Sequence, residues 1–139
     1  VAKIMAAIMV KGDVKNVSCY DPSAGSGTLL MNIAHAIGED KCTIYSQDIS
    51  QKSSNLLRLN LILNNLVHSI SNIIQGNTML HPFHKENNEL RKFDYIVSNP
   101  PFKMDFSDFR DDLDTKENNK LIFKESNLQI FQIFKPFNT

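Results

Sequence analysis

The fold is decided by residues 17–30, VSCYDPSAGSGTLL, and by the segments that follow them. Residues 17–20 form a short apolar run with the character of a strand. A loop with glycines at positions 25 and 27 comes next, and residues 28–37 then carry large apolar side chains at helical spacing. Gly38 is well suited to end that helix. The stretch therefore predicts a strand, a glycine-containing loop and a helix in succession.

The next segments repeat this alternation. Residues 42–47 form a second apolar run that ends in Asp48, and Ser50 is a suitable N-cap for a following helix. In that helix one apolar face is predicted to comprise Leu56, Leu59 and Leu63, extended by Leu66. A third strand is predicted over residues 68–75 and a fourth over residues 93–98. Strands that alternate with helices indicate right-handed crossovers and a mainly parallel, doubly wound α/β sheet.

The remaining segments have simpler interpretations. Residues 1–10 are mostly apolar and are predicted to form a buried helix, since they are too short to span a bilayer. Residues 84–92 are polar and are expected to be a solvated connection. The apolar residues 121–139 contain four phenylalanines at loosely helical spacing, without a clear fifth strand. The predicted sheet is therefore incomplete on one side.

Composition limits the possible functions. The chain has 139 residues, of which 42% are hydrophobic, which suits one globular domain. Its fifteen basic and fifteen acidic residues cancel, so a nucleic-acid partner would have to be held by a local patch or by another subunit. Cys19 and Cys42 have no metal-like spacing and are expected to be buried, reduced thiols. His81 and His84 lack further ligands nearby in the sequence, so no metal site is predicted.

The loop over residues 21–27 is predicted to bind a ligand, because ligands of doubly wound sheets lie beyond the carboxyl ends of the strands. A dinucleotide fingerprint needs a third glycine where Leu30 stands, and a Walker loop needs a lysine after Gly27. Neither is present, so a pyrophosphate ligand is disfavoured. Asp21 could accept from an ammonium group, and Asp48 stands where a carboxylate usually binds ribose hydroxyls. An adenosine joined to an amino acid, S-adenosylmethionine, fits both carboxylates.

A second motif, Asn99-Pro-Pro-Phe102, ends the fourth predicted strand. Proline has no N–H, so this loop cannot continue the sheet, and Asn99 is pushed towards an extended conformation. On its own the motif favours a strand-ending turn over a functional site. The cofactor loop upstream favours the site, because it brings a methyl donor to the same edge of the sheet.

With both motifs in the expected order, the chain resembles amino-methylating DNA methyltransferases, and more narrowly the methylation subunit of type I restriction-modification systems. The resemblance runs from about residue 1 to residue 120. It implies a Rossmann-like fold of the S-adenosylmethionine-dependent methyltransferases and S-adenosylmethionine as cofactor. The residues that it assigns to cofactor binding are Asp21, Ala24, Gly25, Ser26, Gly27, Thr28, Asp48 and Asn77.

The resemblance also implies a catalytic role for Asn99, Pro100, Pro101 and Phe102. Transfer to the N6 amine of adenine needs two acceptors on the amine's N–H bonds, which the Asn99 side-chain oxygen and the Pro100 carbonyl can supply. Pro101 would stiffen the loop, and Phe102 would stack on a base rotated out of the duplex. No side chain with a shifted pKa is required.

Two departures from the family pattern matter. Asn77 stands where the family usually has an aspartate that contacts the cofactor's adenine amine. An asparagine can still accept there through its carbonyl oxygen, without the charge. The second departure is extent, since an N-terminal cofactor-closing segment and the later strands of the family are not recognisable. The chain therefore resembles a central fragment, with residues 1–120 as a partial catalytic core and residues 121–139 as a divergent tail.

The resemblance implies DNA as substrate, a specificity subunit and, in a complete system, a restriction subunit, in the cytoplasm and without a membrane. Two other functions remain open. One is a methyltransferase acting on a protein glutamine amide or on RNA, because the same four-residue motif serves planar amines generally. The other is an inactive, truncated remnant that methylates nothing.

Overall fold

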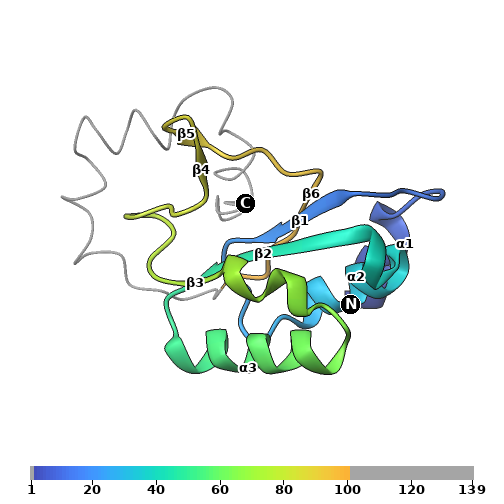
Figure 1. The fold of residues 1–139 in the computed structure, drawn as a ribbon, viewed down its shortest axis with the longest axis horizontal. Coiled ribbons are helices and arrows are strands. Elements are labelled where there is room, and N and C mark those ends of the chain that lie inside the picture. Colours follow the sequence, from blue (N-terminus) through green and yellow to red (C-terminus); the bar gives the residue numbers. More distant parts are fainter. Residues whose placement is uncertain (1, 101–139) are drawn as a thin grey trace, which may run out of the picture.

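A computed structural model describes residues 2–100 of the chain. Their sheet has four strands in the order β3-β2-β1-β6, and all neighbouring strands are parallel. The strands are β1 (Val17–Asp21), β2 (Cys42–Asp48), β3 (Ile73–Gln75) and β6 (Tyr95–Ile96). The chain builds outward from β1 to β3 and then returns to the other side of β1 (Figure 1). This reversal places a switch point between β1 and β6, as a doubly wound sheet requires.

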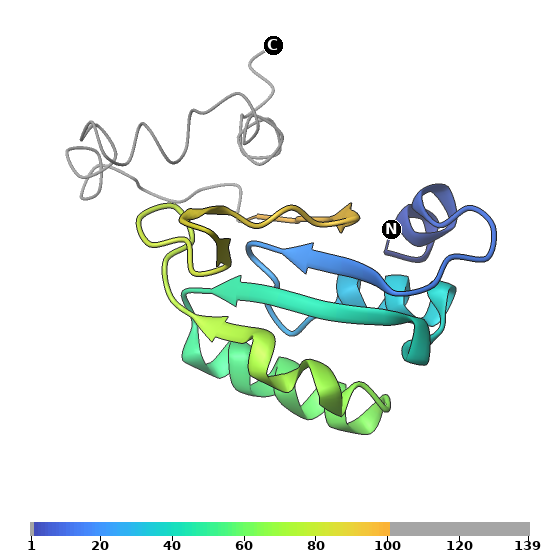
Figure 2. The same ribbon diagram turned by 45° about the horizontal axis from the view of Figure 1, so that its top comes forward.

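Helices cover one face of this sheet. These are α2 (Thr28–Ile37) and α3 (Gln51–Leu63), while α1 (Ala2–Met9) packs beside α2 (Figure 2). Gly38 ends α2, and the Ser50 hydroxyl accepts a hydrogen bond from the Ser53 N–H at the start of α3, as predicted. Side chains of the strands alternate between the two faces of the sheet. The apolar core lies between strands and helices, and its largest fully buried side chains are Cys19, Leu30, Ile33, Ile44, Leu57, Leu61, Leu66 and Ile73.

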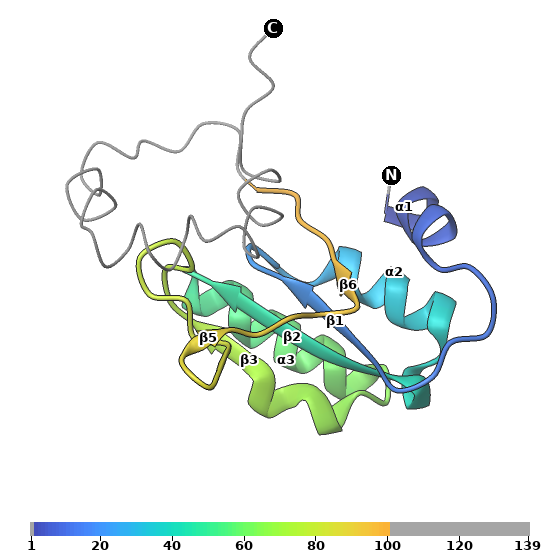
Figure 3. The same ribbon diagram turned by 90° about the horizontal axis from the view of Figure 1, so that it is seen from above.

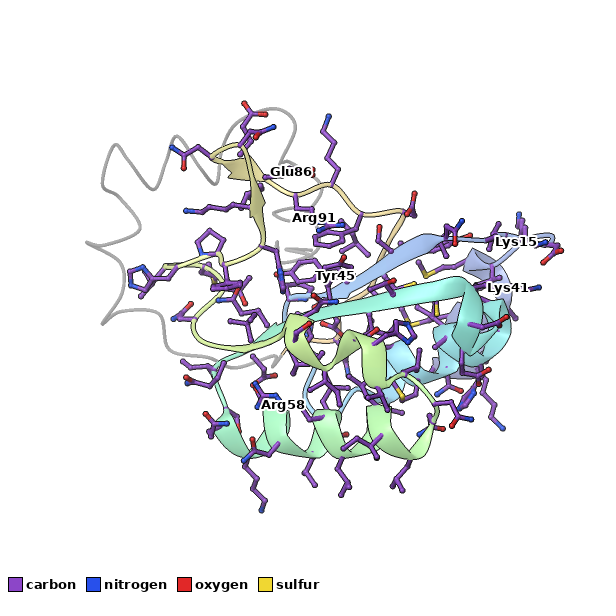
Figure 4. The ribbon with its side chains drawn as sticks, viewed as in Figure 1. Lys15, Lys41, Tyr45, Arg58, Glu86 and Arg91 are labelled. Atoms are coloured by element: carbon purple, nitrogen blue, oxygen red, sulfur yellow. The ribbon has the colours of Figure 1, made fainter. Side chains whose placement is uncertain are left out.

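The segment between β3 and β6 crosses the opposite face (Figure 3). There Tyr20 stacks on Phe93 at 4.5 Å between ring centroids, and His84 meets Tyr45 edge-on. The Arg91 guanidinium lies 4.4 Å from the centroid of the Tyr45 ring, so its charge covers an aromatic face (Figure 4). Burial lowers the pKa of His84. The segment at 84–92 was predicted as a solvated connection, but His84 belongs to this aromatic layer.

Residues 85–90 also depart from the prediction of an irregular connection. They form a small hairpin of β4 (Lys85–Glu86) and β5 (Glu89–Leu90). Asn87 and Asn88 join the strands with positive φ of 51° and 65°. Asparagine tolerates this left-handed conformation, which suits the tight turns of hairpins.

The third predicted strand is only half correct. Residues 67–72 form the 3-10 helix η2 (Val67–Asn72), and β3 begins only at Ile73. The Ser69 hydroxyl accepts from the Ile44 N–H at 2.9 Å, and the Asn72 amide donates to the Ile44 carbonyl at 3.2 Å. Polar side chains thus occupy the edge of β2 where a strand would have paired through its backbone.

Two helices, α1 and α3, form as predicted, but the predictions of their burial are wrong. In α1 only Ala6 is buried, and Ile4 and Ile8 are mostly exposed. In α3 the buried residues are Ser54, Leu57 and Leu61, whereas the predicted face is exposed: Leu56 at 43%, Leu59 at 50% and Leu63 at 70%. Only Leu66, beyond the helix, is buried as predicted. Both sides of α3 are apolar, so periodicity alone could not select the buried one.

The two cysteines lie on neighbouring strands, and both are buried as predicted. A hydrogen bond between the thiols raises the pKa of Cys19 and lowers that of Cys42, with burial raising the former further. Within residues 2–100, no helix is long and apolar enough to cross a membrane. The predictions for Pro101, Phe102, the last part of the predicted catalytic core (residues 103–120) and the tail at 121–139 concern residues outside the described part of the chain.

Candidate functional site

Four segments that the sequence singled out come together at the carboxyl edge of the sheet. The loop of residues 21–27 follows β1, Asp48 ends β2, Asn77 follows β3, and Asn99 follows β6. β1 and β6 are direct neighbours, with Tyr20 paired to Ile96. The two candidate motifs, although far apart in sequence, therefore flank the switch point of the sheet, where ligands of such folds bind.

Asp21 is buried at the end of β1, with 1% of its surface exposed. One carboxylate oxygen accepts a hydrogen bond from the Ser23 N–H at 2.8 Å, which tightens the start of the loop. Burial, together with a smaller effect of the nearby Asp48 charge, raises the pKa of Asp21 to about 7, although the bonds from Ser23 oppose the rise. Asp21 is thus a carboxylate whose charge the described residues do not compensate.

Asp48 ties the cofactor loop to β2. One of its oxygens accepts from the Gly25 N–H and the other from the Ser50 N–H, both at 2.8 Å. A carboxylate has about four lone-pair sites, so two acceptor sites remain on this half-buried group. A hydrogen bond therefore links the loop of residues 21–27 to Asp48, which are predicted to bind different parts of one ligand.

The two loop glycines serve different purposes. Gly25 and Gly27 both have positive φ, of 56° and 84°, where other residues are strained. A Cβ on Gly25 would meet nothing within 4 Å, but one on Gly27 would lie 2.2 Å from Cδ1 of Leu57. Gly27 therefore admits the buried leucine of α3. Ala24 is buried, while Ser26 and Thr28 are exposed around the start of α2.

Asn77 lies between two residues that bond Asp48 and the cofactor loop. The Gly76 N–H donates to the Asp48 carbonyl at 2.8 Å, and the Thr78 hydroxyl donates to the Pro22 carbonyl at 2.7 Å. The Asn77 side-chain oxygen accepts from the N–H groups of Met79 and Leu80, at 3.0 and 3.3 Å. The turn that follows therefore already occupies this oxygen, and the role of Asn77 in cofactor binding stays a prediction.

The catalytic motif is partly described. Asn99 is exposed and Pro100 half-buried, just beyond β6, while Pro101 and Phe102 lie outside the described residues. The preceding residue, Ser98, has its hydroxyl 2.7 Å from that of Ser23. This bond joins the segment carrying Asn99 to the loop carrying Asp21.

Two residues at this edge of the sheet, Ser98 and Gln47, were not predicted as part of the site. Gln47 is buried and donates to the His81 carbonyl at 2.8 Å, while its oxygen accepts from the Phe83 N–H at 3.0 Å. It thereby holds the loop that follows Asn77. A polar residue inside an otherwise apolar strand was the available signal, since a buried amide needs partners from a distant segment. Serines 75 residues apart offered no such signal.

Metal ligands do not gather in the part of the chain that the structure describes. Among residues 2–100, no three His, Cys, Asp or Glu side chains are grouped so that they could hold a metal ion. His81 is exposed, and the Nε2 of His84 lies 3.0 Å from the Ser46 carbonyl. The donor groups at this edge are therefore amides, hydroxyls and backbone N–H groups around two carboxylates.

Comparison with protein families gives one match over nearly the whole chain. The family model of the N-6 DNA methylases matches residues 1–132. Among curated proteins, the methylase subunit of the type I restriction enzyme MpnII from Mycoplasma pneumoniae is 30% identical over 118 residues. That match covers 77% of this chain and 21% of the relative.

Solved structures give the same result for the fold. The methyltransferase subunit of a type I restriction-modification system from Streptococcus thermophilus is similar with a TM-score of 0.65 and 29% identity, over 81% of this chain and 25% of that one. An S-adenosylmethionine-dependent O-methyltransferase from Thermotoga maritima, 15% identical, shares the fold with a TM-score of 0.52, over 72% of this chain and 34% of that one. The predicted methyltransferase-type α/β fold is confirmed. The chain spans about a fifth to a quarter of the length of the two type I relatives.

Proposed function

The chain belongs to the N-6 DNA methylase family, and from this premise we propose that it transfers a methyl group from S-adenosylmethionine to the N6 amine of adenine in DNA. The observation that carries the proposal is the 2.7 Å contact between the hydroxyls of Ser23 and Ser98. It supports a single site, because it brings the cofactor loop and the Asn99 segment together at the switch point of the sheet.

Binding of the cofactor is assigned to groups whose chemistry fits it. The two remaining acceptor sites of Asp48 suit the ribose hydroxyls. The Asp21 carboxylate, with its pKa raised to about 7 by burial, suits a nearby ammonium group, which would compensate its charge. Gly25 and Gly27 keep the backbone close to the ligand, with Ala24, Ser26 and Thr28 beside them. Bound there, the cofactor supplies an electrophilic methyl group on a sulfonium.

Activation of the adenine amine is assigned to Asn99 and Pro100. The lone pair of this amine is delocalised into the ring, so the nitrogen is a poor nucleophile. The Asn99 side-chain oxygen and the Pro100 carbonyl would each accept a hydrogen bond from one of the amine's two N–H groups, which favours a tetrahedral nitrogen. Asn99 is exposed three residues beyond the end of β6, where a rotated base could reach it. Pro101 and Phe102 are assigned the stiffening of this loop and the stacking on that base.

Recognition of a DNA sequence is assigned to a partner. Fifteen basic and fifteen acidic residues leave the chain without the excess positive charge that holds DNA. A specificity subunit would choose the site, as in a type I system, and a restriction subunit would complete the complex. We propose that this assembly acts on DNA in the cytoplasm.

Cofactor binding and methyl transfer test the proposal separately. Titration calorimetry of the whole chain with S-adenosylmethionine should show binding that Asp48→Ala weakens and Asn99→Ala leaves unchanged. In a complex with its specificity subunit, tritium should pass from the labelled cofactor to DNA that contains adenine and not to DNA made only of guanine and cytosine.

A matched variant separates catalysis from general damage. Asn99→Ala should abolish tritium transfer, whereas Asn88→Gly, an exposed asparagine of the hairpin with positive φ, should leave it unchanged. Undiminished adenine methylation by Asn99→Ala would contradict the catalytic role proposed for Asn99. Full cofactor affinity in Asp48→Ala would remove Asp48 from the site.

A further inference from the structure

Asn77 is fixed beside Asp48, just after the strand that neighbours β2. Asp48 ends β2, and Asn77 follows the adjacent strand β3, with the Gly76 N–H bonded to the Asp48 carbonyl at 2.8 Å. On its other side the Thr78 hydroxyl binds the Pro22 carbonyl of the cofactor loop at 2.7 Å. If Asp48 holds the ribose, as proposed above, the base extends towards the end of the neighbouring strand.

The orientation of the Asn77 amide follows from its partners. Its oxygen accepts from two backbone N–H groups, those of Met79 and Leu80, at 3.0 and 3.3 Å. Of the two ends of the amide, only the oxygen can accept from an N–H, so the nitrogen cannot occupy this position. The turn is closed further by the His81 N–H, which donates to the Asn77 carbonyl at 2.9 Å. The oxygen therefore serves as the cap of the turn.

The other half of the amide is left as a donor. Among residues 2–100, the hydrogen bonds of the Asn77 side chain are both made by its oxygen. The amide NH₂ is left with two donors and no acceptor. An aspartate could cap the same turn with one oxygen and present the second oxygen as an acceptor. An asparagine in place of an aspartate therefore removes a charge and also replaces a free hydrogen-bond acceptor with a free donor.

We infer that Asn77 is a specificity-determining residue that requires a hydrogen-bond acceptor on the edge of the bound purine. The 6-amino group of adenine is a donor, so it is mismatched with the Asn77 NH₂, and only ring nitrogens remain to pair with it. A 6-oxopurine presents an oxygen at the same place and matches it. The site therefore favours 6-oxopurine nucleosides more than the same site with an aspartate does. This inference rests on the proposed function.

The test compares two stable nucleoside ligands that differ only at the 6-position. S-adenosylhomocysteine and S-inosylhomocysteine are titrated calorimetrically into the whole chain and into Asn77→Asp. The ratio of the inosyl to the adenosyl dissociation constant is expected to rise roughly tenfold or more in Asn77→Asp. The aspartate oxygen can accept from the 6-amino group of adenine, so the adenosyl ligand gains a hydrogen bond. It cannot donate to the 6-oxygen of hypoxanthine, so the inosyl ligand loses one.

Two further variants separate the presented group from the cap. Asn77→Ser keeps a capping oxygen and removes the NH₂, so the ratio should also shift towards the adenosyl ligand. Asn77→Ala removes cap and donor together, and it should weaken both ligands as the turn loosens. Thermal melting without ligand shows whether each variant is folded.

The outcomes distinguish this inference from the proposed function. If both ligands bind and neither Asn77→Asp nor Asn77→Ser changes the ratio, Asn77 does not select the base, while the cofactor site stands. If neither ligand binds any folded form of the chain, the cofactor site itself is refuted, and the inference is refuted with it.

Discussion

The hydroxyl oxygens of Ser23 and Ser98 lie 2.7 Å apart, although 75 residues separate them in the chain. Ser23 also donates its N–H to Asp21, and Ser98 directly precedes Asn99. The pair therefore links the two loops that the proposed reaction requires to be placed together. A bond of this kind can fix the position of the loops without contacting the substrate.

Removal of the Ser98 hydroxyl should slow methyl transfer without weakening cofactor binding. In Ser98→Ala, kcat is expected to fall roughly fivefold, since the lost bond is worth about 1 kcal/mol. KM for S-adenosylmethionine should be unchanged, because the contacts of Asp48 remain. Steady-state tritium transfer at varied cofactor concentration measures both constants. Ser71→Ala, at an exposed serine of η2, is the control, and an equal loss in both variants would contradict the linking role.

The raised pKa of Asp21 predicts a pH-dependent stability. In the folded chain the pKa is about 7, whereas an unfolded aspartate titrates near 3.9. Between these values the folded state binds more protons, so the free energy of unfolding should fall as pH rises from about 4 to about 7. Asp21→Asn is neutral throughout and should remove this decline. Urea denaturation at about pH 5 and about pH 8 measures it.

Asp94 provides the control for this experiment. It accepts from the N–H and the hydroxyl of Ser18, both at 2.8 Å, and the backbone bond lowers its pKa. Its stabilising effect is present above the ordinary carboxyl pKa and is lost only as pH falls through the lowered one. Asp94→Asn should therefore keep the decline between about pH 5 and about pH 8. A slope that persists in Asp21→Asn would show that another group titrates.

Gly27 should be far less replaceable than Gly25. Alanine at either position meets a left-handed backbone, which costs about 1–2 kcal/mol. At Gly27 the new Cβ would also lie 2.2 Å from Cδ1 of the buried Leu57, and such overpacking costs about 1–3 kcal/mol more. Chemical denaturation of Gly27→Ala and Gly25→Ala compares them directly. Equal losses would mean that the loop can move away from α3.

Truncation of two leucines in α3 tests which of its faces is buried. Leu57 is 1% exposed, so Leu57→Ala should lower the free energy of unfolding by about 2–5 kcal/mol. Leu59 is 50% exposed, and Leu59→Ala should cost about 1 kcal/mol or less. Denaturant unfolding of both variants at one pH measures the two losses in the free energy of unfolding. A larger loss for Leu59→Ala would favour the face that the sequence pattern predicted.

The sequence by itself determined the order of the four parallel strands and of the α-helices that alternate with them, the glycine loop and the positions of Asp21 and Asp48. These depend on local properties: β1 and β2 are short apolar runs, Gly38 and Ser50 bound their helices, and a carboxylate after a strand reaches the sheet edge whatever packs around it. The family resemblance depended on the same local motifs. For this reason the predicted fold class is confirmed over the described residues.

Only the tertiary structure decided which atoms meet. Leu57 rather than Leu56 faces the core because Gly27 leaves room for it, a contact between residues 30 positions apart. Residues 67–72 form a 3-10 helix because their side chains reach the β2 backbone, and the Asn77 oxygen is occupied because the turn after β3 closes on it. Ser23 meets Ser98 because β6 returns beside β1. Such contacts depend on the packing of distant segments, which the periodicity of one segment does not contain.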